Sequence, residues 1–322
     1  MAKPKVAFYW NASCGGCEEA VVDLAEDILK VVDAVDIVLW PVAMDFKRSD
    51  VEALEDGEIA VSFINGAVRT SEQEDWSHLL RRKSGLVVAF GACACFGGVP
   101  GLANFFDRKQ LMDLVFHELP TNDNPKKTEP QLETKMPEGE LELPSLYDTV
   151  YSLDQVIDVD YYLPGCSPPP KLIMEAIEAI LSGNLPPKGS TLTTPKSLCD
   201  ECARNETKPD KIKISELRRP HLTEMDPEKC FLAEGVICMG PATRGGCGER
   251  CINANMPCRG CFGPTEEVRD QGAKFLSALG SLIDTKDPEE MDRITETLPD
   301  PAGLFYMYSL PISLLRRKQK TS

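Results

Sequence analysis

The sequence predicts an α/β protein in which a parallel sheet is followed by an irregular, cysteine-rich region. In the first part of the chain, short apolar segments alternate with segments of helical periodicity. After residue 189 the composition changes, and eight of the thirteen cysteines lie within residues 199–261. That second region is rich in glycine and proline and has no sustained periodicity, so we expect it to fold around bound metal. We therefore expect two domains, over residues 1–189 and 190–322.

The elements can be assigned in chain order. Strands are expected at residues 5–10, 35–44, 59–64, 86–90 and 156–163. Helices are expected at 18–35, from a capping box at Ser71 through residue 80, and at 111–119, 171–181, 266–283 and 288–298. Strands that alternate with helices favour a parallel sheet covered on both faces. Residues 120–145 contain five prolines and many charges, which predicts an exposed insertion.

Charge and hydropathy exclude several classes of function. The chain has 51 acidic and 35 basic side chains, a net charge of −16, whereas a nucleic-acid-binding protein needs a basic surface. No segment has the roughly 18 apolar residues of a membrane helix. The N-terminal apolar run covers only residues 6–10, too short for a secretory signal. We therefore expect a cytoplasmic protein without nucleic-acid or membrane partners, whose cysteines bind metal or do redox chemistry rather than form disulfides.

Three cysteine motifs directly follow three of the predicted strands. The first strand leads into Cys14 and Cys17, the fourth into Cys93 and Cys95, and the fifth into Cys166. A single CxxC pair would equally fit a thioredoxin-like redox site. The carboxyl ends of parallel strands, however, meet at one edge of the sheet, where open α/β sheets bind their ligands. Cys14, Cys17, Cys166 and one of the remaining two therefore make four thiolates, the set that holds a 4Fe–4S cluster.

The cysteines of the second region form two further groups of four. They are Cys199, Cys202, Cys230 and Cys238, followed by Cys247, Cys251, Cys258 and Cys261. Zinc is the alternative to iron–sulfur here, because four-cysteine zinc sites also use two-residue spacings and also fold small domains. A zinc-stabilised structural or regulatory protein is thus the alternative to an electron-transfer subunit. The N-terminal cysteines are spread over about 150 residues, whereas structural zinc takes compact local spacings.

Taken together, these motifs resemble the small, electron-transferring subunit of nickel–iron hydrogenases. The similarity covers nearly the whole chain outside residues 120–145, and it rests on CGGCEE at 14–19, GACACFGG at 91–98, LPGC at 163–166, CMGPAT at 238–243 and PCRGC at 257–261. The resemblance implies a flavodoxin-like domain that binds a proximal cluster, and an irregular domain that binds a medial and a distal cluster.

The resemblance also implies the ligands of each cluster. It assigns a proximal group to Cys14, Cys17, Cys93 and Cys166. It assigns a distal group to Cys199, Cys202, Cys230 and Cys238, and a medial group to Cys247, Cys251, Cys258 and Cys261. Cys95 is then expected to be a buried apolar residue. Glu19 resembles a family glutamate suggested to help protons leave the large subunit, although an acid in the first turn also simply favours a helix.

Two departures point to a subgroup. Periplasmic members have a histidine where this chain has Cys199. They commonly have a proline near the medial site, whereas this chain offers Cys251 there as a fourth thiolate. Both departures resemble the G subunit of cytoplasmic, viologen-reducing hydrogenases, which do not use the deazaflavin coenzyme and associate with heterodisulfide reductase in methanogens. The small subunit of a deazaflavin-reducing hydrogenase is the alternative.

The resemblance further implies what this chain does not hold. The large subunit of the family binds nickel through two CxxC pairs, one followed by a histidine, whereas Cys261 is followed by Phe-Gly-Pro. We therefore expect three 4Fe–4S clusters, with neither nickel nor flavin. The expected function is to pass electrons from hydrogen oxidation in the large subunit to an iron–sulfur acceptor subunit and heterodisulfide reductase. This chain alone is not expected to split hydrogen.

Overall fold

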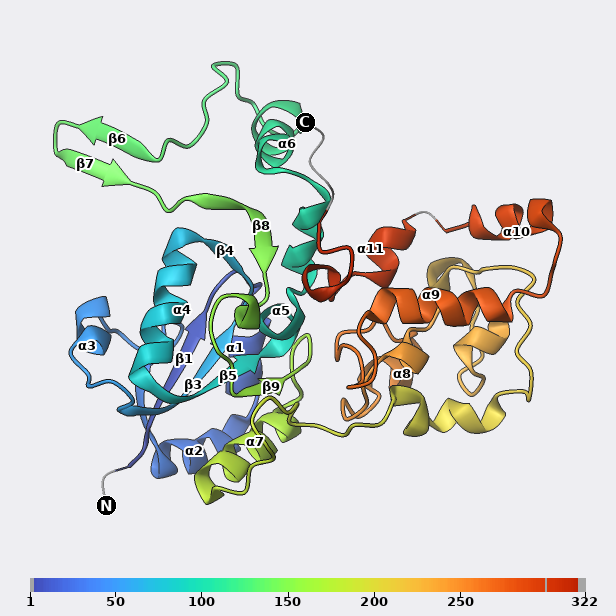
Figure 1. Cartoon of the computed structure of the whole chain (residues 1–322), viewed down its shortest axis with the longest axis horizontal. Helices are drawn as coiled ribbons and strands as arrows, with labels where there is room; N and C mark the ends of the chain where they lie inside the picture. Colours follow the sequence, from blue (N-terminus) through green and yellow to red (C-terminus); the bar gives the residue numbers. More distant parts are fainter. Residues whose placement is uncertain (1–2, 299, 318–322) are drawn as a thin grey trace.

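The first region of the protein is built on a five-stranded parallel sheet (Figure 1). The computed structural model describes residues 3–298 and 300–317. The strand order is β2-β1-β3-β5-β9, with β1 at Lys5–Trp10, β2 at Asp36–Leu39, β3 at Ile59–Asn65, β5 at Ser84–Phe90 and β9 at Tyr161–Leu163. All four pairs of neighbouring strands are parallel. This is the strand order of flavodoxin, so the α/β, flavodoxin-like prediction is confirmed.

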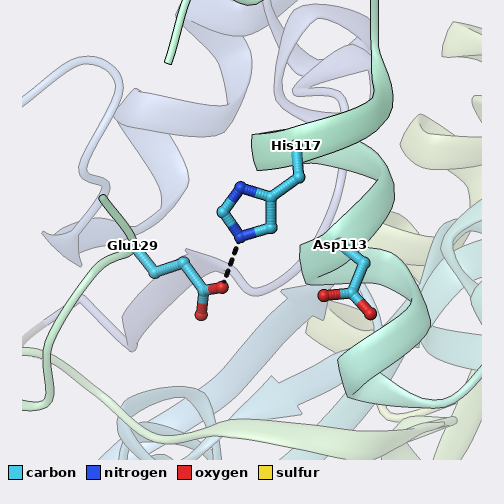
Figure 2. Close-up of side chains that lie close together, drawn as sticks. All are labelled: Asp113, His117 and Glu129. Atoms are coloured by element: carbon cyan, nitrogen blue, oxygen red, sulfur yellow. Dashed lines mark hydrogen bonds and ion pairs between the residues drawn. The ribbon is translucent and has the colours of Figure 1, made fainter. Parts of the chain in front are cut away.

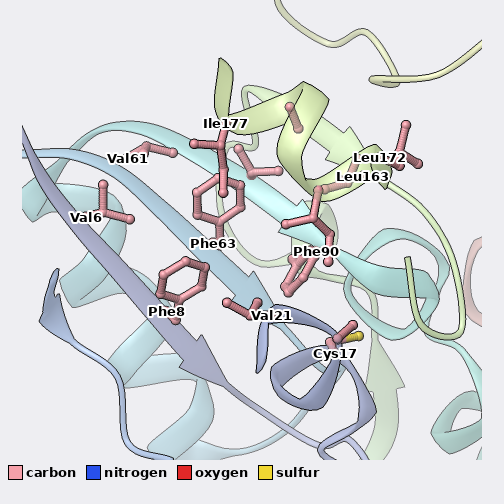
Figure 3. Close-up of a cluster of buried hydrophobic side chains, with 14 of the residues drawn as sticks. Val6, Phe8, Cys17, Val21, Val61, Phe63, Phe90, Leu163, Leu172 and Ile177 are labelled. Carbon is pink, nitrogen blue, oxygen red and sulfur yellow. The ribbon is translucent and has the colours of Figure 1, made fainter. Parts of the chain in front are cut away.

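Helices cover both faces of the sheet. One face packs against α1 (Gly16–Val22), α2 (Ile28–Ala34) and α7 (Pro170–Ser182). Figure 3 shows this core, in which Phe8, Phe63 and Phe90 project from three neighbouring strands toward Val21 and Ile177. The opposite face packs against α3 (Arg48–Glu52), α4 (Ser71–Lys83) and α5 (Gly91–Phe96). Because both faces are buried, the strands are largely apolar, which explains their apolar runs in the sequence.

Several predicted elements are shorter than expected. The helical period at 18–35 is divided between α1 and α2 by a 3₁₀ turn at Ala25–Asp27, where Ala25 has a φ of +52°. The strand expected at 156–163 is only β9, because the residues before it form turns that bury apolar side chains. The cap of α4 is Thr70 rather than Ser71. Thr70 has an extended backbone, and its hydroxyl oxygen accepts a hydrogen bond from the backbone N–H of Gln73. In return, the side-chain oxygen of Gln73 accepts a hydrogen bond from the backbone N–H of Thr70.

The predicted insertion is an exposed hairpin that projects from the sheet domain (Figure 1). It lies between α6 (Arg108–Asp113), which continues into a π-helical turn at Leu114–Glu118, and β8 (Leu146–Tyr151), which pairs with β4 (Val68–Thr70). In the hairpin, β6 (Glu133–Met136) pairs with β7 (Gly139–Glu142). The register gives it one apolar, exposed face, made by Leu132, Met136, Leu141 and Leu143.

The second region is largely irregular, as predicted. Its helices are α8 (Arg250–Asn253), α9 (Gln271–Leu282), α10 (Pro288–Thr295) and α11 (Pro301–Phe305). Their core includes Phe231, Phe275 and Phe305, together with several cysteines. The chain then returns to the sheet domain, where Pro311 packs so closely on Gly97 that a Cβ there would lie 2.1 Å from the proline ring. The boundary expected at residue 189 stays a prediction.

Within residues 3–298 and 300–317, no helix has both the length and the apolar character needed to span a bilayer.

Candidate functional site

The proximal group gathers at the carboxyl ends of β1, β5 and β9. Burial raises the pKa of the Cys17 thiol, and so do the thiols of Cys93, Cys166 and Cys14, which lie close enough to repel a charge on Cys17. Burial and the same neighbours raise the pKa of Cys93 to about 12. Residues about 150 positions apart thus converge on one site, as the strand order requires. Thiolates this close together repel one another, so a bound cation would stabilise them.

Two glycines make room for these thiols. A Cβ at Gly91 would lie 2.3 Å from the sulfur of Cys17, and one at Gly98 would lie 2.5 Å from the sulfur of Cys93. Their φ angles of +85° and +56° also favour glycine. The glycines of the GACACFGG motif therefore serve the close approach of backbone and sulfur.

Cys95 lies away from this group. Its side chain is 2% exposed, belongs to the core on the opposite face of the sheet and donates to the carbonyl of Ala89 at 3.2 Å. This placement fits a buried structural residue, whereas the half-buried Cys93 faces the other proximal thiols.

The distal group lines a cavity of about 420 Å³ in the second region. All four of its cysteines contribute to the wall, beside apolar residues such as Leu198 and Ile252. Burial and the neighbouring thiols of the group together raise the pKa of Cys199 to about 12. Burial also raises the pKa of Cys238, to about 11, although backbone hydrogen bonds from Gly240 and Cys258 act to lower it. A Cβ at Gly240 would lie 3.2 Å from the sulfur of Cys199, so the backbone approaches closely here as well.

The medial group lies between the other two. On one side, the Cys166 backbone hydrogen-bonds the sulfur of Cys261, whose pKa burial raises to about 12. On the other side, the backbone N–H of Cys258 donates to the sulfur of Cys238 at 3.4 Å. Cys247 packs against the sheet-domain core and the core of the second region alike. The three groups therefore form a continuous series through the protein.

The spacing of the thiols can be compared with the spacing that zinc requires. A tetrahedral zinc ion with Zn–S bonds of about 2.3 Å holds its sulfur ligands about 3.8 Å apart. In residues 3–298 and 300–317, three ligand atoms of His, Cys, Asp or Glu lie within 4.8 Å of one another at one place. Only Asp113, His117 and Glu129 form such a group in this part of the chain. Among the described residues, no three cysteine sulfurs therefore lie within 4.8 Å of one another.

Two residues at the site were missed by the sequence analysis. Glu18 is 1% exposed and accepts hydrogen bonds from Trp40 and Asn65, and burial raises its pKa. Glu19, the predicted candidate, is exposed on the outer side of α1. The Tyr308 hydroxyl hydrogen-bonds the sulfur of Cys166 from the returning end of the chain. The sequence held one signal for the burial of Glu18, namely the polar Asn65 at the end of the apolar strand β3. No local signal in the sequence marks Tyr308.

Comparison with known proteins identifies the family of this chain. The family described as NADH ubiquinone oxidoreductase, 20 Kd subunit, matches residues 14–180. The iron–sulfur G subunit of the F420-non-reducing hydrogenase of Archaeoglobus profundus is 40% identical over 98% of each chain. The G subunit of the F420-non-reducing hydrogenase of Methanothermobacter marburgensis is 34% identical over 99% of this chain and 98% of that one.

A solved structure gives the same fold. The NiFeSe hydrogenase from Desulfovibrio vulgaris Hildenborough aligns with 83% of this chain and 95% of its own, with a TM-score of 0.50 and 17% identity. Because the two G-subunit relatives are 34–40% identical over nearly the whole chain, the chain belongs to the family of F420-non-reducing hydrogenase G subunits. It is therefore a subunit of a hydrogenase, which is an oxidoreductase.

Proposed function

We propose that this chain is the electron-transfer subunit of its hydrogenase and binds three 4Fe–4S clusters at the proximal, medial and distal groups. When bound, the clusters would supply one-electron transfer from hydrogen oxidation in the large subunit to an acceptor. Twelve of the thirteen cysteines take part, and Cys95 is the exception. The chain itself would hold neither nickel nor flavin.

The observation that carries this proposal is the middle position of the medial group. Cys261 is hydrogen-bonded to the backbone of Cys166, and Cys258 to the sulfur of Cys238, so medial cysteines adjoin both other groups. A protein that used its cysteines only to stabilise separate domains would have no need of such a series. Electron transfer between two partners does require it.

The residues of the chain have three tasks in this function. The thiolates bind and balance the charge of each cluster. Backbone N–H groups and the Tyr308 hydroxyl donate to cysteine sulfurs, and such hydrogen bonds are among the factors that set reduction potentials. Glycines at 91 and 98 keep the backbone close to the proximal sulfurs.

The exposed side of the proximal group fits the large subunit as a partner. Cys14, Cys166 and Glu19 are exposed there. Nearby in sequence, Trp10 is 43% exposed at the end of β1, and Val99 is 47% exposed after the second motif. We infer that these side chains belong to the interface with the large subunit. The Glu19 carboxylate would then lie at this interface, where it could take part in proton exit.

The acceptor would approach the distal end of the series. We propose an iron–sulfur acceptor subunit followed by heterodisulfide reductase, in the cytoplasm and in the service of methanogenesis or a related metabolism. The names of the relatives, F420-non-reducing, favour this subgroup over the deazaflavin-reducing hydrogenases.

The test is hydrogen-driven reduction in the complete complex, purified anaerobically. Cys258→Ala should remove the medial cluster and stop electron delivery to the acceptor, while the proximal cluster is still reduced by hydrogen in electron paramagnetic resonance (EPR) spectra. Cys95→Ala removes an equally buried thiol and should leave both unchanged. Full electron delivery in the Cys258→Ala complex would contradict the proposal.

A further inference from the structure

Outside the cysteine groups, one set of side chains brings three metal-ligating atoms together. Asp113 ends α6, His117 lies on the π-helical turn that continues it, and Glu129 comes from the following loop. One ligand atom of each lies within 4.8 Å of the other two. Figure 2 shows the imidazole of His117 between the two carboxylates. Its Nε2 atom is 2.6 Å from a carboxylate oxygen of Glu129. A small adjustment would place all three around one ion.

The loop that carries Glu129 is held in position by two asparagine side chains. Asn122 donates to the carbonyl of Val115 at 2.8 Å, and Asn124 donates to that of Phe116 at 3.0 Å. These carbonyls lie near the end of the helix, where intrahelical donors run out. The loop is therefore fastened to the helix independently of any ion, and part of the ordering needed for binding is already complete.

The charge and the type of the ligand atoms select the class of ion. Two carboxylates and a neutral imidazole carry a charge of −2, which an ion pair between Lys109 and Asp113 reduces in part. One nitrogen and two carboxylate oxygens suit divalent ions such as Zn²⁺, Mn²⁺ or Fe²⁺. Calcium prefers an all-oxygen set, and Cu⁺ prefers sulfur. The side chain of Glu129 is 39% exposed, so water can complete the coordination.

We propose that Asp113, His117 and Glu129 bind a divalent first-row transition-metal ion that fastens the base of the β6–β7 hairpin to α6. The hairpin projects from the sheet domain (Figure 1), and it follows the Glu129 loop directly in the chain. An ion at this point joins residues on both sides of the turn between helix and hairpin. It would thereby fix the direction in which the apolar hairpin face points. The site uses oxygen and nitrogen ligands and does not depend on the cysteine groups.

The test is a titration of the cluster-loaded full chain with Mn²⁺, with free Mn²⁺ measured by EPR. Mn²⁺ is the probe because it prefers oxygen and imidazole ligands to thiolates. His117→Gln and Glu129→Gln should each weaken the binding of one Mn²⁺ by at least about tenfold. Glu118→Gln removes an adjacent exposed carboxylate and should leave the affinity unchanged. Lys109→Met removes the competing ammonium group and should strengthen binding.

Proteolysis gives a second measurement. Lys126 and Lys127 are exposed in the same loop, so Mn²⁺ should slow tryptic cleavage there in the wild type and have no effect in His117→Gln. Equal Mn²⁺ uptake by the wild type and His117→Gln would overturn the site. Cleavage of the wild type at the same rate with and without bound Mn²⁺ would overturn its role as a clip.

Discussion

The backbone N–H of Cys258 donates a hydrogen bond to the sulfur of Cys238, with 3.4 Å between nitrogen and sulfur. This contact joins the medial group to the distal group, just as the contact between Cys261 and the Cys166 backbone joins it to the proximal group. The medial group therefore contacts both the proximal and the distal group. The role of each cysteine in this series can be tested by substitution.

The first prediction separates Cys93 from Cys95. Cys93→Ser should abolish the proximal cluster and hydrogen-driven viologen reduction, because the side chain faces the other proximal thiols. Cys95→Ser should retain most of both, because Cys95 is buried in the core and hydrogen-bonded to Ala89. Iron content and EPR spectra of the two variants check this. Loss of the cluster in Cys95→Ser alone would mean that the ligand assignment is shifted by two residues.

The second prediction concerns Gly91. Gly91→Ala should lose the proximal cluster, because the new Cβ would lie 2.3 Å from the sulfur of Cys17. Gly183→Ala is the matched control, since Gly183 also has a positive φ, +70°, but no atom lies near its added Cβ. Both variants should lose about 1–2 kcal/mol of stability from the left-handed backbone. Only Gly91→Ala should lose about four iron atoms, and equal iron in both variants would show that the close contact is unimportant.

The third prediction concerns Cys251, the exposed member of the medial group. Cys251→Pro should convert the medial cluster to 3Fe–4S and leave the other two intact, because three thiolates suffice for that cluster. The residue is the second of α8, where the backbone N–H has no intrahelical partner for proline to remove. The oxidised variant should give a new EPR signal. An unchanged spectrum with full iron content would mean that Cys251 is not a ligand.

The fourth prediction concerns Asp160, whose carboxylate links the sheet to Arg81 at 2.6 Å and Lys188 at 2.5 Å and accepts from the backbone of Val87. Burial acts to raise the pKa of Asp160, but these hydrogen bonds outweigh it and lower the pKa. Its stabilising contribution is therefore complete above about pH 3.9 and is lost as the pH falls through the lower folded-state pKa.

Asp160→Asn should accordingly lower the free energy of unfolding near neutral pH by about 1–3 kcal/mol. The difference from the wild type should shrink in strong acid. Urea unfolding across this pH range measures it, and Asp158→Asn, an exposed neighbour, is the control with little expected effect. A difference that stays constant down to the lowest pH would show that the Asp160 charge is not responsible.

The sequence predicted the features that depend on local pattern. Apolar runs located the strands, and the cysteine motifs at their ends located the proximal group, because parallel strands share one carboxyl edge. Features that depend on tertiary contacts were not predictable. The burial of Glu18 depends on Trp40 and Asn65, which are distant in sequence. The burial of Cys95 was expected from the family resemblance, and it follows physically from how α5 packs on the sheet. Tyr308 reaches Cys166 only because the chain returns to the sheet domain.

The assignment of three 4Fe–4S clusters is tested most directly by iron and acid-labile sulfide analysis of the chain, purified anaerobically and fully reconstituted. Twelve cysteine ligands in three groups predict about twelve iron and twelve sulfide per chain, without nickel. A colourless protein that carries zinc and no sulfide, or one that holds about eight iron atoms or fewer, would contradict the assignment.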